Sequence, residues 1–110
     1  MSKLNFNEKG LIPAIVQDED TGKVLMLGYM TEEMLRKTLE SGEVWFYSRS
    51  RQENWHKGAT SGNKLKLCSI RKDCEDNSLL VKARPIGPTC HTGHKSCFYR
   101  DLDGTELEKD

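Results

Sequence analysis

Two short stretches of this 110-residue chain concentrate side chains that bind metal ions. The segment GPTCHTGHKSC, residues 87–97, holds two cysteines and two histidines, and the segment DCEDN, residues 73–77, holds another cysteine among acidic residues. Three thiolates with water as fourth ligand would form an open zinc site of the catalytic kind. The candidate ligands are Cys74, Cys90 and Cys97. Because the paired CxxC knuckles of a zinc ribbon are absent, scattered buried thiols remain the alternative.

The acidic segment admits two interpretations. If residues 73–77 are extended, Asp73, Glu75 and Asn77 point to one face, and Cys74 and Asp76 point to the other. Three oxygen donors on one face suit a hard cation such as Mg²⁺, whereas a thiolate suits a softer metal. Taken alone, the composition favours the alternative, an acidic and solvated turn.

A predicted long polar loop, SRSRQENWHKGATSGN at residues 48–63, combines cations, hydroxyls and glycines. Such groups together can hold a phosphate, although an ordinary surface loop has a similar composition and no Walker A pattern occurs. A tryptophan can stack on a heterocycle, but Trp45, in a predicted strand, is expected in the core. The candidate substrate-binding residues are Arg49, Arg51, Trp55, Lys57, Thr60 and Ser61.

Several short strands and one helix are expected to position these groups. Apolar runs at 11–16 and 24–30 flank turn residues and predict a hairpin. Thr31 is a predicted helix N-cap and Gly42 a predicted helix end. Further strands are predicted at residues 43–48, 64–70 and 78–83, with Cys68 in the core. The sequence therefore predicts an α+β, mainly β domain, with a small mixed or antiparallel sheet of about five strands around one helix.

Composition indicates one domain, residues 1–110, with an acidic tail from about residue 101 that we expect to be loose. Only 35% of the residues are apolar, and a modest core is often supplemented by a metal or a partner chain. Seventeen basic and seventeen acidic residues cancel, which argues against nucleic-acid or membrane partners. We expect a cytoplasmic protein, in which cysteines serve as metal ligands or core residues more often than in disulfides.

In combination, these segments resemble the phosphoribosyl-AMP cyclohydrolase family of histidine biosynthesis, in its monofunctional form. The matching text covers about residues 10–100 and consists of VLMLGYM, FYSRSRQENWHKGATSGN, DC and LLVKARPIGPTCHTGHKSCFYR. The resemblance implies an enzyme that hydrolyses the adenine ring of N1-(5-phosphoribosyl)-AMP between N1 and C6, with a zinc-bound water as nucleophile. The family also occurs fused to a phosphoribosyl-ATP pyrophosphatase domain. Since the matching text and the 110 residues of this chain correspond to the cyclohydrolase part, only the cyclohydrolase step is expected here.

The same resemblance implies two metal sites in an intertwined homodimer. One zinc ion per subunit would be bound by Cys90 and Cys97, with Cys74 supplied by the other subunit. A Mg²⁺ ion would be bound at Asp73, Glu75 and Asn77. The family usually has aspartate at all three magnesium positions, so Glu75 and Asn77 depart from the pattern and cost the site one negative charge.

Histidines offer a base with a pKa near neutral, and His91, next to Cys90, is our first choice as general base. His56 and His94 are the other candidates. Two other classes of protein remain as alternatives. In a zinc-stabilised interaction module without catalysis, Cys68 or a histidine would complete a closed site. A zinc nucleobase deaminase would require the H-x-E…P-C-x-x-C signature, which is absent.

Overall fold

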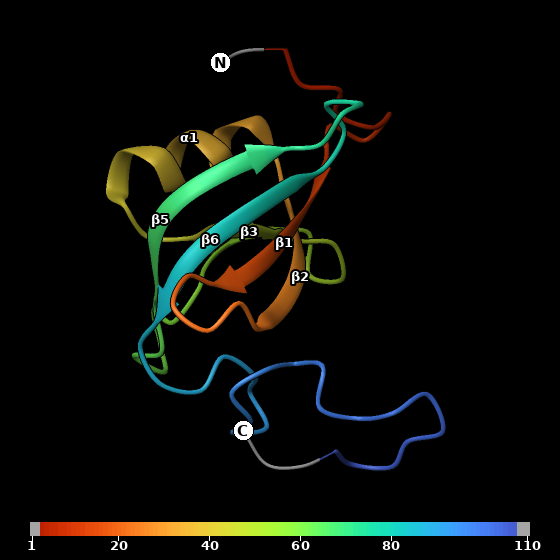
Figure 1. Ribbon diagram of the computed structural model, residues 1–110. Coiled ribbons are helices and arrows are strands. Elements are labelled where there is room, and N and C mark those ends of the chain that lie inside the picture. The colour runs from red at the N-terminus through yellow and green to blue at the C-terminus, as the bar shows by residue number, and fades with distance from the viewer. Residues whose placement is uncertain (1–2, 108–110) are drawn as a thin grey trace.

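Six strands and one helix are formed within residues 3–107, the part of the chain that the computed structural model describes (Figure 1). The elements are β1 (Ile12–Asp18), β2 (Val24–Met30), α1 (Glu32–Ser41), β3 (Trp45–Ser48), β4 (Glu53–His56), β5 (Leu65–Lys72) and β6 (Leu79–Pro85). Four strands form a mixed sheet in the order β2–β1–β6–β5, in which β1 and β6 run parallel and the other neighbours antiparallel. β3 and β4 form a separate antiparallel hairpin. The predicted mainly β class with one helix is confirmed.

The core lies against one face of the four-stranded sheet. Ile12, Ala14 and Val16 of β1 are buried in alternation, whereas Ile15 between them is exposed. The parallel neighbour β6 buries Leu79, Val81 and Ala83 in the same manner. This period of two is the pattern of strands with one solvated face.

Helix α1 begins and ends where the sequence predicts. The Thr31 hydroxyl accepts a hydrogen bond from the Met34 backbone N–H at 3.1 Å. Gly42 has a φ of 73°, and its N–H donates to the Thr38 carbonyl at 3.0 Å, so a left-handed residue closes the last turn. Within residues 3–107, no helix is long and apolar enough to cross a membrane.

The prediction of a long polar loop is wrong in the middle of the segment, because residues 53–56 form β4, a strand that the sequence pattern does not predict. Pairing with β3 places Trp55 opposite Phe46 and His56 opposite Trp45. The rings of Trp45 and His56 stack with centroids 4.1 Å apart, and Trp45 packs against the core as expected. These cross-strand aromatic pairs stabilise a strand whose sequence shows no apolar alternation.

One further expectation is corrected near β5. Cys68 is exposed rather than in the core, because Leu65 and Leu67 face the core and Cys68 lies on the opposite face of the strand. The β5–β6 register shifts between Leu67 and Ser69, so that Ile70 rather than Ser69 is the next residue turned inward.

Residues 73–77 form the acidic turn that their composition favours, and Asp76 has a φ of 58°. The alternation of Asp73, Glu75 and Asn77 against Cys74, which an extended segment would give, therefore does not apply. We call residues 73–77 the acidic turn.

The expected acidic tail is described up to residue 107, and residues 108–110 lie outside the described part. The Asp101 N–H donates to the Thr105 carbonyl at 2.7 Å, and the Leu107 N–H donates to the Tyr99 carbonyl at 2.8 Å. These bonds fold residues 99–107 into a small hairpin below the sheet in Figure 1.

Candidate active site

The segment that follows β6, residues 87–97, folds into a loop that brings two cysteines together; we call it the cysteine loop. The Cys90 N–H donates to the His94 carbonyl at 3.0 Å, which turns the chain back on itself. The Cys97 N–H donates to the Leu25 carbonyl at 2.7 Å, and the Ser96 hydroxyl donates to the Val24 carbonyl at 2.7 Å. The loop is thereby attached to the free edge of β2.

The two thiols of the cysteine loop form a hydrogen-bonded pair. Burial opposes ionisation of Cys90, but hydrogen bonds from Thr92, including one from its hydroxyl at 3.0 Å, outweigh burial and lower the pKa of Cys90. Burial, followed by the charge on Cys90, raises the pKa of Cys97 to about 11. With its pKa raised to about 11, Cys97 stays a thiol at neutral pH, and a cation is needed before both sulfurs become thiolates. Such a donor pair suits zinc.

Lys57 connects the hairpin of β3 and β4 to the cysteine loop. Its side chain is buried, and Nζ donates to the Thr89 carbonyl at 2.5 Å. Burial lowers the pKa of Lys57, whereas the nearby Cys97 and Cys90 raise it. The Thr89 hydroxyl is itself buried and has no hydrogen-bond partner among the described residues. Lys57 is thus directed at the cysteine loop rather than into a surface phosphate cradle.

Cys74 lies far from the other two candidate ligands of the same chain. It precedes β6, whereas Cys90 follows β6, and seven residues of extended strand span about 20 Å. Figure 1 shows the β5–β6 turn and the C-terminal segment at opposite ends of the sheet. Zinc–sulfur bonds of about 2.3 Å require sulfurs within about 4 Å of each other. Within residues 3–107, no three or more Cys, His, Asp or Glu side chains gather as a metal site.

The three histidines differ in their surroundings. The His56 Nε2 lies 2.8 Å from Glu43 Oε1. The His94 Nε2 lies 3.1 Å from Glu106 Oε1, and its ring stacks on Tyr99 with centroids 3.6 Å apart. His91 is exposed, directly beside Cys90.

The candidate substrate-binding residues do not gather in one place. Arg49 lies 3.8 Å from the centroid of the Tyr29 ring, and Arg51 lies 3.9 Å from Glu53, both near the tip of the β3–β4 hairpin. Trp55 is partly exposed and packs on Phe46. The remaining candidates beyond β4 are Lys57, Thr60 and Ser61. Four residues of β4 separate these two groups.

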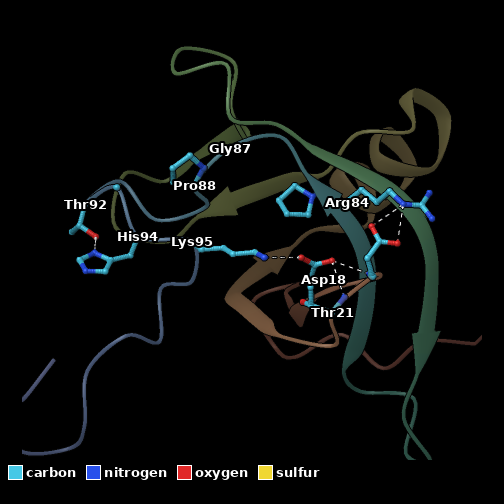
Figure 2. A pocket seen from close by; sticks show the side chains of 11 residues that line it. Asp18, Thr21, Arg84, Gly87, Pro88, Thr92, His94 and Lys95 are labelled. Atoms are coloured by element: carbon cyan, nitrogen blue, oxygen red, sulfur yellow. Dashed lines mark hydrogen bonds and ion pairs between the residues drawn. The ribbon is translucent and has the colours of Figure 1, made fainter. Parts of the chain in front are cut away.

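A cleft of about 830 Å³ adjoins the cysteine loop (Figure 2). It lies between that loop, the β1–β2 turn and the end of β6. Figure 2 shows Lys95 extending from the loop toward Asp18, with Nζ 3.6 Å from a carboxylate oxygen. Asp18 is buried and also accepts the backbone N–H of Asp20 at 2.9 Å. The sequence places Asp18 in a turn, but nothing in the pattern indicates that it is buried or that it anchors the cysteine loop.

We expect Asp18→Asn to lower stability by about 1–2 kcal/mol at neutral pH, since a charge-assisted contact is lost. Burial raises the pKa of Asp18, but backbone N–H donors and Lys95 outweigh it and hold the pKa below its ordinary 3.8. A depressed pKa contributes stability above the unfolded-state pKa, and that stability is lost as the pH falls through the folded-state pKa. In urea unfolding, the difference in the free energy of unfolding between variant and parent should shrink below about pH 4. An equal difference at pH 7 and pH 3 would exclude this role.

The matching family model and two of the similar relatives carry the same family description. The family model described as phosphoribosyl-AMP cyclohydrolase matches residues 26–99, which include all three candidate zinc ligands. The chain is 52% identical to a phosphoribosyl-AMP cyclohydrolase of Clostridium botulinum, over 93% of this chain and 94% of that protein. A cyclohydrolase of Listeria monocytogenes is 54% identical over 90% of this chain and 93% of its own length.

Relatives of a second kind are longer. The histidine biosynthesis bifunctional protein HisIE of Caldanaerobacter subterraneus subsp. tengcongensis is 57% identical over 94% of this chain, which spans about half (50%) of that relative's length. Both kinds of relative match nearly the whole of this chain. The chain therefore belongs to the phosphoribosyl-AMP cyclohydrolase family.

Proposed function

We propose that the protein hydrolyses the adenine ring of N1-(5-phosphoribosyl)-AMP between N1 and C6, as a step of histidine biosynthesis. The observation that carries this proposal is the pairing of Cys90 and Cys97, beside Lys57, within the region that matches the family. A hydrogen-bonded pair of thiols on a loop, away from the hydrophobic core, suits the binding of a metal ion. The exposed His91 lies next to that pair.

Zinc is the metal that these residues fit. Cys90 and Cys97 would hold it, and Cys74 of a second subunit would complete the set. When bound, zinc supplies a Lewis acid that activates water for attack on an electron-poor ring carbon. Lys57 places a positive charge beside the two thiols and fixes the loop through Thr89, so that the loop geometry exists before metal and substrate arrive.

His91 is proposed as the general base that takes a proton from the attacking water. His56 and His94 are each held by a carboxylate, whereas His91 is exposed beside a metal ligand. A proton must also reach N1 as the N1–C6 bond breaks, and the imidazole that accepts a proton from water can donate it to N1.

Substrate contacts are proposed at two separate places. Arg49 and Arg51 lie near the tip of the β3–β4 hairpin, and Thr60 and Ser61 lie beyond β4. The substrate carries two phosphate groups, so two separated groups of donors match its chemistry better than one cradle would. Trp55 is exposed enough to stack on the ring.

A homodimer is proposed as well, and the positions of the cysteines support it. A two-fold axis perpendicular to β6 would place the start of one β6 strand beside the end of the other, and thus Cys74 beside the partner's Cys90. The open face of the sheet offers apolar surface for this contact, because Ile15 pairs with Leu27 on one side and with Leu80 on the other. Ile15 and Leu27 are 38% and 47% exposed in the single chain.

Incubation of the zinc-loaded protein with phosphoribosyl-AMP tests the activity. Ring opening changes the ultraviolet absorbance of the purine, so we expect a continuous signal that scales with enzyme concentration. A matched Cys90→Ala protein should give none. A folded protein that contains zinc and leaves the substrate unchanged would contradict the proposal and would favour a zinc-stabilised interaction module instead.

A further inference from the structure

In the acidic turn, the Asp73 carboxylate accepts hydrogen bonds from the turn itself, at the place where the resemblance implies a magnesium ion. One carboxylate oxygen of Asp73 accepts the backbone N–H groups of Asn77 at 2.8 Å and Ser78 at 3.1 Å. The Asn77 side chain is oriented with its amide nitrogen toward Asp73, since the reverse orientation would set two oxygens against each other. In this orientation the amide donates to the two carboxylate oxygens at 2.7 Å and 3.3 Å.

The other acidic side chains of the turn are directed elsewhere. Asp76 pairs with Lys72 at 3.1 Å. Glu75 is exposed, and its backbone carbonyl accepts a hydrogen bond from the Asn5 side chain at 3.0 Å. Among residues 3–107, no three or more acidic, histidine or cysteine side chains are grouped so that they could hold a metal ion. The residues present therefore do not fit the implied magnesium site, which needs oxygens converging on a single point.

The charge of residue 77 determines whether the acidic turn needs a cation. An aspartate there would face Asp73 with a second carboxylate within about 3 Å, and such a pair needs a shared cation or proton. The neutral amide of Asn77 instead supplies donors to the same oxygens. We propose that the Asn77 amide takes the place of the divalent cation, so that the acidic turn of this chain is complete without Mg²⁺. This inference concerns the turn alone and does not depend on the proposed activity.

Thermal unfolding and calorimetry of the zinc-loaded protein test this proposal, with Mg²⁺ alone as the added ligand. We expect the melting temperature of the parent to stay constant as Mg²⁺ rises into the millimolar range. Asn77→Asp should melt at a lower temperature without Mg²⁺, recover as Mg²⁺ is added, and bind Mg²⁺ at least about tenfold more tightly than the parent, because one full charge is gained.

Asn77→Ala is the matched control, since it removes the amide without adding a carboxylate. It should melt at a lower temperature than the parent and show no response to Mg²⁺. Saturable binding of one Mg²⁺ per chain to the parent, lost in Asp73→Asn, would overturn the proposal and would mean that the Asn77 carbonyl faces a cation. That measurement decides the question even if Asn77→Asp fails to fold.

Discussion

We expect Cys97→Ala to abolish zinc binding and ring opening together, in a protein that remains folded. The expectation rests on the thiol pair, because removal of one member leaves a single sulfur in the cysteine loop and no chelating set. The rate should fall to that of the uncatalysed reaction. Zinc content by elemental analysis and the ring-opening rate are measured on the same preparation, with circular dichroism to establish the fold. Cys90→Ala should behave in the same way.

Cys68→Ala provides the matched control, since Cys68 is an exposed cysteine outside the cysteine loop. It should retain both zinc and activity. An inactive Cys97→Ala protein that still holds a full complement of zinc would show that Cys97 is not a zinc ligand. Cys68 would then become a candidate ligand.

We expect His91→Ala to keep zinc but to lose about 10²–10⁴-fold in kcat, the usual contribution of a general base. His94→Ala serves as a comparison. It removes contacts to Thr92 and Glu106, so it should lower stability more than it lowers kcat. A His91→Ala kcat within a few-fold of the parent would exclude His91 as the base.

The parts of the fold that the sequence predicts well depend on local chemistry. The β1–β2 hairpin follows from two apolar runs around turn residues, and the ends of α1 follow from Thr31 and Gly42. Caps and turns are decided by neighbours within four residues, so a single sequence contains the information they need.

The errors arise where distant residues decide the structure. β4 is stabilised by stacking across the hairpin, in which His56 lies on Trp45, and this gives no periodic signal along the chain. Cys68 lies on the face of β5 opposite Leu65 and Leu67, beside a register shift that only the β5–β6 pairing shows.

In the candidate site too, local sequence predicts some features, and others depend on distant residues. The closeness of Cys90 and Cys97 follows from their short separation in sequence, which a loop closes easily. The roles of Lys57 and Asp18 could not be predicted, because both depend on burial between elements far apart in the chain. A lysine in a Gly-rich polar segment indicates a phosphate contact, and the bond from Lys57 to the Thr89 carbonyl has no signal in the sequence.

Recombination of two inactive variants tests most directly whether one active centre is built from two chains. Cys74→Ala and Cys90→Ala proteins are mixed, partly unfolded and refolded so that chains exchange, and the heterodimer is isolated with two different affinity tags. In the heterodimer, the Cys74→Ala chain offers Cys90 and Cys97 while its partner offers Cys74, so one intact site re-forms. We expect about half of the parental zinc and activity to return, since one of two symmetric sites is complete. Verified heterodimers that hold no zinc and open no substrate would contradict the shared site.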